Sequence, residues 1–331
     1  QGRGQCYRGR ARIGISEFRD QPARFDLLFR EPEQLAHAKG VWARMEACDG
    51  LGRFVGDKAA VDALEKASTK DRFWGVRRSA CLALGEVGSP DARDALLRSL
   101  KGQDSRVRRG IYRALGKFRK DDAAFRALSK AYTEDGTYLP MATAARALGE
   151  SRHPKAFETI VRGMDRPSQA EVIARNAAGA LADLREERGI EILTARTAYG
   201  QPELRRFGAA ASLGKLGSYY DRRIDEVLDE LSALMKDPNF RTNLGAVDGI
   251  VALGERKGID ELQKVADTAI LGNLRRNARR GIADLRSKAA DHAKRLEQQD
   301  DLDKLKDENK ELKTRLTTLE AKVDAFAKRR K

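Results

Sequence analysis

The chain has 331 residues, of which 41% are hydrophobic, 35% are charged and 6% are aromatic, and its formal net charge is +15. This hydrophobic content is enough for a packed protein and excludes a chain that is disordered throughout. No apolar run approaches the ~20 residues that a membrane-spanning helix needs, and the three cysteines form neither a disulfide framework nor a CxxC motif. We therefore expect a basic, helix-rich, cytoplasmic protein without a membrane partner.

The N-terminal segment, residues 1–30, does not fit the pattern of the rest of the chain. It holds seven arginines against three acidic residues. Two interpretations remain open: a flexible basic arm that contacts RNA, or the remnant of an upstream domain. The chain begins at Gln1 rather than at Met, so we also expect a fragment of a longer protein or a processed product.

A short phrase of small and apolar residues recurs through residues 31–290. A leucine or isoleucine stands at its centre, and glycine follows in six of eight copies. The central residues, 29 to 40 positions apart, are Leu51, Leu84, Leu115, Leu148, Leu181, Leu213, Leu253 and Ile282. Such a period over most of a chain predicts stacked helical hairpins rather than one globular core. We predict an all-α fold, a right-handed α-solenoid of about eight hairpins.

Small residues surround each central residue. Alanines such as Ala80 and Ala83, four and one positions before Leu84, predict a slim helix face that neighbouring helices approach closely. The glycine after the leucine suggests a left-handed helix C-cap. Cys48 and Cys81 share one repeat position, so we interpret them as small core residues.

The pairs Val76-Arg77 and Val107-Arg108 stand ahead of the small face, and with them the pattern resembles the HEAT repeat in its short Ala-Leu-Gly form. Arginine also recurs seven positions before the central residue, at Arg44, Arg77, Arg108, Arg206 and Arg275. The resemblance implies that these arginines join a structural ladder between neighbouring repeats. The alternative is a basic stripe on the concave surface that holds phosphates or an acidic peptide.

Adjacent arginines supply the candidate partner-binding residues, which are Arg108, Arg109, Arg205, Arg206, Arg275, Arg276, Arg279 and Arg280. A protein or peptide is the expected partner, and nucleic acid is the alternative. Binding to a nucleic-acid backbone should weaken steeply with salt because counterions are released. The cluster at residues 275–280 occupies more than one angle around its helix, so we expect some of its arginines to be exposed and others structural.

No catalytic constellation is evident in the sequence. It contains no HExxH, no GxGxxG after a strand, no P-loop and no GxSxG. His37, His153 and His292 fall in different repeats, whereas a metal site needs ligands that converge. We therefore predict no catalytic residue, no metal ligand and no cofactor within this chain.

Two segments suggest a more specific relationship. Pro32-Glu33-Gln34-Leu35 with Val41–Ala47 opens the first repeat, and Asp71–Ala80, with its Phe73-Trp74-Gly75 phrase, opens the second. Together they resemble the C-terminal HEAT-type region of bacterial zinc aminopeptidases of the aminopeptidase-N class. In that family the region is not catalytic and helps to enclose the substrate chamber. The resemblance implies a zinc-dependent catalytic domain upstream, outside this chain.

The C-terminal segment, residues 291–331, carries a heptad pattern and a basic tail. The a positions combine apolar residues with one asparagine, and the d positions are apolar throughout, a pattern that favours a parallel dimeric coiled coil. The predicted dimerisation residues are Leu302, Leu305, Asn309, Leu312, Leu316, Leu319, Val323 and Phe326. An exposed single helix or an appended segment is the alternative.

Three main functional hypotheses follow, and a repeat enzyme that acts on bilins or damaged bases is the remaining alternative. The first is a non-catalytic HEAT-repeat scaffold that forms the C-terminal part of an aminopeptidase-like zinc metallopeptidase. The second is a free-standing HEAT adaptor that dimerises through its coiled coil and binds a protein partner. The third is a nucleic-acid binder that uses its arginine stripe on the phosphate backbone.

Overall fold

The computed structural model of the chain describes residues 32–287. The basic arm predicted at residues 1–30 and the coiled coil predicted at residues 291–331 lie outside the described residues. The chain divides into two compact units, residues 1–252 and residues 253–331. Each unit is described by itself.

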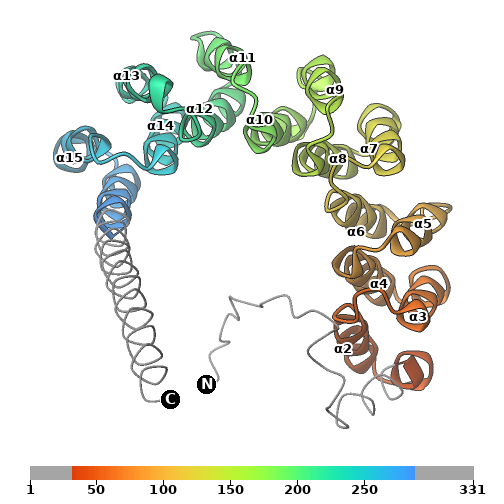
Figure 1. Cartoon of the computed structure of the whole chain (residues 1–331). Helices are drawn as coiled ribbons and strands as arrows, with labels where there is room; N and C mark the ends of the chain where they lie inside the picture. The colour runs from red at the N-terminus through yellow and green to blue at the C-terminus, as the bar shows by residue number, and fades with distance from the viewer. Residues whose placement is uncertain (1–31, 288–331) are drawn as a thin grey trace, which may run out of the picture. The chain divides into compact units, whose positions relative to one another are not determined.

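The first unit is built from helices in two layers that follow an arc, with an inner row on the concave side and an outer row on the convex side (Figure 1). The inner helices are α2 (Val41–Leu51), α4 (Trp74–Val87), α6 (Ser105–Leu115), α8 (Tyr138–Ser151), α10 (Val172–Leu184), α12 (Glu203–Gly217) and α14 (Phe240–Leu253). The outer helices are α3 (Lys58–Lys70), α5 (Pro90–Arg98), α7 (Asp122–Glu134), α9 (Ala156–Gly163), α11 (Gly189–Thr197) and α13 (Ile224–Leu234). Short 3₁₀ turns at Gln169–Glu171 and Asp221–Arg223 precede α10 and α13, and residues 32–37 are also helical.

Polar side chains start several of these helices. The carboxylates of Asp57 and Asp121 accept hydrogen bonds from backbone N–H groups three residues later, at 2.9 and 2.8 Å. Ser89 does the same at the start of α5, where Pro90 occupies the first helical position. These side chains satisfy N–H groups that have no partner inside a helix. The turns between the two layers are therefore fixed by the local sequence.

The central residues of the repeat form the core. Leu51, Leu84, Leu115, Leu148, Leu181 and Leu213 are fully buried in the six inner helices that they occupy. The thiols of Cys48 and Cys81 are also buried, and burial raises the pKa of each to about 12. Both cysteines are core residues, which confirms their interpretation from the repeat.

The glycine after each leucine has a different role from the one expected. Gly52 and Gly116 end their helices with right-handed backbone angles, and Gly85 and Gly149 lie inside α4 and α8. A Cβ on Gly149 would lie 2.5 Å from the carbonyl oxygen of Ala180 on the next inner helix. These glycines are needed because adjacent inner helices pack backbone against backbone, and only Gly254 among the six has the positive φ of a left-handed residue.

The second unit contains α15 (Gly258–Thr268) and a helix that covers residues 272–287 of the described chain. Leu274, Ala278, Ile282 and Leu285 are buried and lie on one side of this helix, at spacings of three and four residues. All the secondary structure of residues 32–287 is helical. An all-α chain of repeats is thus confirmed for the described residues.

Candidate binding site on the inner helices

Arginines seven positions before the central leucine clamp the chain of the next repeat. Arg44 of α2 contacts Asp71 through Nε at 2.7 Å and donates a second bond to the carbonyl of Ala38 at 3.0 Å. Arg108 of α6 makes two bonds of 2.8 Å to the carboxylate of Asp135. Each aspartate lies where an outer helix ends and the turn to the next inner helix begins.

Arg206 of α12 is the most buried of these clamps. Its guanidinium is paired with Asp237, and its Nε donates to the carbonyl of Thr197 at 2.7 Å. The two side chains are only 5% and 8% exposed. The hydrogen bond from Arg206 holds the pKa of Asp237 below its usual value. The geometry fits the ladder interpretation, and it corrects the candidate set, because a side chain buried in this way cannot contact a partner.

Arg205, the neighbour of Arg206, is also engaged within the first unit. It lies 2.9 Å from Glu171 and 3.1 Å from Asp165, and its side chain is 15% exposed. Arg108 and Arg205 therefore already have carboxylate partners. Of the four candidate arginines on α6 and α12, Arg109 alone makes no ion pair with a described residue.

Arg109 belongs to a group of arginines on the solvent-facing side of the inner helices. Arg78 of α4 and Arg109 lie six positions before their central leucines, and Arg113 lies two positions before Leu115. Arg113 is exposed and the other two are half-buried. No ion pair or hydrogen bond joins any of the three to another residue of the described chain, and the Nε of Arg109 is buried without a partner. We refer to Arg78, Arg109 and Arg113 as the unpaired arginines.

The unpaired arginines are close enough to affect one another. Burial lowers the pKa of Arg78, and the positive charges of Arg113 and Arg109 lower it further. Like charges held together repel, and none of the three arginines is in an ion pair with a carboxylate of the described residues. The site therefore favours binding of an anion.

Glycines on the inner helices make room for such arginines. A Cβ on Gly110 would lie 2.9 Å from Cγ of Arg78, and one on Gly208 would lie 2.9 Å from Cγ of Arg175. A Cβ on Gly179 would lie 3.1 Å from Nη1 of Arg146. The arginine of one helix thus lies across a glycine of the next, on α4, α8 and α10. This arrangement keeps the arginines flat on the inner surface.

A cavity of about 420 Å³ opens among α6, α8 and α10. Its charged lining residues are Arg109, Arg113, Arg146 and Glu150. Arg146 is neutralised locally, since its Nε lies 2.8 Å from Asp183 and 3.5 Å from Glu150. The two unpaired arginines in the lining are left without a carboxylate.

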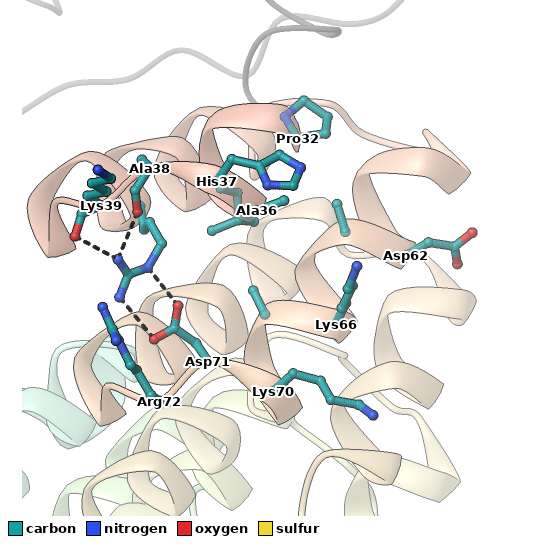
Figure 2. Close-up of a pocket in the computed structure, with 14 residues that line it drawn as sticks. Pro32, Ala36, His37, Ala38, Lys39, Asp62, Lys66, Lys70, Asp71 and Arg72 are labelled. Carbon is teal, nitrogen blue, oxygen red and sulfur yellow. Dashed lines mark hydrogen bonds and ion pairs between the residues drawn. The ribbon is translucent and has the colours of Figure 1, made fainter.

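A second cavity, of about 750 Å³, lies between the helix at residues 32–37 and α3 (Figure 2). The clamp formed by Arg44 and Asp71 closes one side of it, while Lys66 and Lys70 lie on the other. Its lining also includes Leu35, Ala63 and Ala67, so much of this space is apolar. Because the cavity adjoins the first described residue, Pro32, it carries no functional assignment.

The remaining candidate arginines lie in the second unit. Arg275, Arg276, Arg279 and Arg280 are all exposed on the helix at residues 272–287. The expectation that some of them would be structural is therefore wrong. The reason is that Leu274, Ala278 and Ile282 already fill the buried side of this helix.

Sequence analysis missed Arg78, Arg113 and Arg146, and it also selected the buried Arg206. The available signal was the position of each arginine relative to the central leucine, since residues two positions before it are exposed or half-buried on the inner helices, and most of those six positions before it are half-buried. Adjacency of arginines in the sequence was a poor guide, because neighbours on a helix point about 100° apart.

The Phe73-Trp74-Gly75 phrase serves packing. The two rings lie 5.5 Å apart at the start of α4, and the guanidinium of Arg106 lies 4.4 Å from the Trp74 ring. Such a cation–π contact joins two neighbouring inner helices. These packing contacts therefore account for the Phe73-Trp74-Gly75 sequence without a relationship to zinc aminopeptidases.

Within residues 32–287 no group of histidine, cysteine and acidic side chains has the arrangement of a metal site, and none of the helices described is long and apolar enough to cross a membrane. His153 is instead buried, with its Nε2 2.9 Å from Asp122 and its ring stacked on Phe125.

Residues 66–141 and 138–214 match HEAT repeats. No curated protein sequence matches the chain. Among solved structures, human deoxyhypusine hydroxylase in complex with glycerol is 15% identical, with a TM-score of 0.36 and coverage of 80% of this chain and 99% of that one. The CpcE–CpcF complex of phycocyanin lyase from Nostoc sp. PCC7120 is 24% identical, with a TM-score of 0.43 and coverage of 79% and 94%.

Kap121p bound to Pho4p is 15% identical, with a TM-score of 0.43, and the match covers 81% of this chain but 34% of that one. At these identities and TM-scores, the likenesses say nothing about what this chain binds or does. The HEAT-repeat prediction is confirmed over residues 66–214, and none of these matches shows the resemblance to zinc aminopeptidases.

Proposed function

We propose that this chain of HEAT repeats is a non-catalytic scaffold whose inner helices α4 to α10 bind an acidic segment of a protein partner. The observation that supports the proposal is the state of the unpaired arginines. Arg78, Arg109 and Arg113 gather on one surface with no carboxylate partner in the described chain, whereas Arg44, Arg108, Arg205 and Arg206 all have one.

An unpaired cluster of this kind favours association. Concentrated positive charge attracts acidic segments over distance and raises the rate of encounter. The planar guanidinium then binds a carboxylate with two parallel hydrogen bonds, a geometry that lysine cannot provide. The clamps supply a firm framework, so the surface is already formed before the partner arrives.

Fluorescence polarisation with a labelled oligoglutamate peptide tests the proposal, at about 0.15 M salt, where distant charges are screened. Replacing Arg78, Arg109 and Arg113 by glutamate should abolish binding while the circular dichroism spectrum stays unchanged. The matched control replaces three exposed arginines away from the inner helices, Arg119, Arg126 and Arg162, and should retain most of the binding. Equal losses in the two triple variants would show that only net charge matters and would overturn the proposed site.

The aminopeptidase-like parent protein is a separate proposal that depends on the sequence resemblance alone. An immunoblot of source-cell lysate with an antibody to this chain tests it. A band well above the 36.8 kDa of the chain would favour an upstream catalytic domain with zinc. A band at that mass would contradict the aminopeptidase-like parent and favour a free-standing adaptor.

The coiled-coil homodimer also stays a prediction. Light scattering on the full chain and on a chain truncated after Gln299 tests it, with a dimer expected for the first and a monomer for the second. The same number of subunits in both proteins would contradict dimerisation through the segment from Leu302 to Phe326.

Nucleic acid is a second candidate partner because four exposed arginines, Arg275, Arg276, Arg279 and Arg280, share one helix of the second unit. Retention on a DNA column should then fall steeply with salt. Replacing the four by glutamate should remove that retention. Retention that survives the replacement would exclude this helix as the DNA-binding element.

A further inference from the structure

We infer that the cavity among α6, α8 and α10 is a binding site for a single phosphate group carried by a side chain of the partner, that is, for a phosphorylated protein segment. This inference rests on the proposed function, since the segment lies along the same inner helices. It adds to the proposed function that one residue of the bound segment carries a phosphate group.

The cavity is built for a compact anion. Its 420 Å³ is bounded by side chains from three successive inner helices. Arg109 and Arg113 come from α6 on one side, Arg146 and Thr143 come from α8, and Asn176 comes from α10. Three guanidinium groups therefore share one hollow with a single carboxylate, that of Glu150.

The hydroxyl hydrogen of Thr143 and one N–H of the Asn176 amide are already used. Thr143 donates its hydroxyl hydrogen to the carbonyl of Leu139 at 2.8 Å, and Nδ2 of Asn176 donates to Val172 at 2.8 Å. Arg146 is held by Asp183 and Glu150. Arg109 and Arg113 are the two guanidinium groups of the lining without an ion pair to a described carboxylate, and Nε of Arg109 is buried with no partner. The donor set left for a ligand is thus mainly cationic.

A phosphate monoester fits this donor set better than a carboxylate does. It carries a charge of about −1.5 to −2 at neutral pH and three strong acceptor oxygens. A carboxylate carries one charge and can accept a bidentate contact from one guanidinium, which would leave the second arginine unpaired. Two unpaired guanidiniums in one hollow therefore select the dianion.

The surroundings favour a peptide over a nucleic-acid backbone. Glu86, Glu150 and Asp183 stand two positions after the central leucines of α4, α8 and α10, on the same side as the arginines. A nucleic-acid backbone would place a phosphate near each of these carboxylates and be repelled, whereas a protein segment can place neutral or basic residues beside them. The apolar lining residues Leu139 and Val172 suit a peptide side chain next to the phosphate.

The test is a titration of the full chain, labelled with ¹⁵N at arginine, with O-phospho-L-serine and with L-glutamate at constant ionic strength. The signals followed are the Nε–H groups of Arg109 and Arg113. Phosphoserine should shift them saturably and bind about tenfold more tightly than glutamate, the factor expected for one further charge-assisted hydrogen bond.

Two variants and a control sharpen the result. Arg113→Gln should weaken phosphoserine binding about tenfold, and Arg113→Lys should restore only part of it because lysine lacks the planar fork. Arg126→Gln makes the same charge change on the exposed face of α7 and should leave phosphoserine binding unchanged. Arg113 is exposed, so its replacement leaves the core intact.

Equal affinity for phosphoserine and glutamate, or shifts that never saturate, would overturn the phosphate site. If the oligoglutamate peptide still requires the unpaired arginines in that case, the proposed function stands without it. If neither the oligoglutamate peptide nor phosphoserine binds, both the proposed function and the phosphate site fail. Tight binding of a short DNA duplex that is lost in Arg113→Gln would overturn the phosphopeptide in favour of nucleic acid.

Discussion

Adjacent arginines on the same helix have different roles in this protein: one is hydrogen-bonded within the fold and its neighbour has no partner in the described chain. Arg108 makes two bonds to Asp135 in the next turn, while Arg109 faces the inner surface with its Nε unpartnered. On α4, Arg77 likewise donates to the carbonyl of Asp71 at 2.8 Å, while Arg78 has no partner in the described chain. One residue step rotates a side chain about 100° around the helix, and that rotation separates a structural clamp from a free cation.

The comparison teaches that net charge is a poor guide to the binding surface of this chain. The clamps add to the formal charge of +15 but are neutralised within the repeat stack. Burial lowers the pKa of Arg78 most, and the charges of Arg113 and Arg109 lower it further, so we expect the unpaired arginines to weaken the fold slightly. Substitutions in the two groups should therefore change stability in opposite directions.

The largest effect is expected from the most buried clamp. Arg206→Met leaves the carboxylate of Asp237 8% exposed and without its cation. Breaking such a buried pair should lower the free energy of unfolding by about 3 kcal/mol. Urea unfolding monitored by circular dichroism measures the change. Arg126→Met on the exposed face of α7 is the control, and a similar loss there would contradict a special role for the clamp.

A smaller loss is expected where the inner helices touch. Gly149→Ala would place a Cβ 2.5 Å from the carbonyl oxygen of Ala180, so the helices must separate. We expect a loss of about 1–3 kcal/mol in the free energy of unfolding. Gly179→Ala is the matched control, because its new Cβ would meet a side-chain atom, Nη1 of Arg146, at 3.1 Å and no backbone atom of the next helix. That variant should be neutral or stabilised by up to about 1 kcal/mol through helix propensity.

Acid should weaken the clamp at Asp237 in a defined direction. The hydrogen bond from Arg206 lowers the pKa of Asp237 in the folded protein below the value of about 3.9 in an unfolded chain. Its contribution to stability is therefore complete above that unfolded value and is lost as pH falls through the folded pKa. Urea unfolding at pH 7 and at pH 3 should show a smaller pH difference for Asp237→Asn than for the original chain. Identical pH differences would exclude this linkage.

The smallest effect has the opposite sign. Arg113→Gln removes one of three like charges and should raise the free energy of unfolding by a few tenths of a kcal/mol, about the size of a surface charge pair. The gain should shrink at high salt because the charges are screened. Thermal unfolding at low and high salt measures it. A loss of stability would mean that Arg113 has a structural contact, and would remove it from the binding surface.

Much of the fold could be predicted from the sequence because the repeat is local. The spacing of Leu51, Leu84 and Leu115 predicts helices of one type, and all three leucines are buried. The role of Gly149 could not be predicted, since a glycine near a helix end serves a left-handed cap or a close approach equally well. The contact with Ala180 in the next repeat decides between the two roles.

For the site, the sequence determined the basic character of the chain, and the resemblance to HEAT repeats implied the arginine ladder, with a basic stripe as the alternative. The sequence could not determine which arginines remain free. That depends on whether a carboxylate from another helix lies within reach, as Asp135 does for Arg108 and Asp237 does for Arg206. Packing of successive repeats also brings Arg109, Arg113 and Arg146 around one cavity. Only the tertiary structure creates that site, since its walls come from helices whose side chains meet across the stack rather than along the chain.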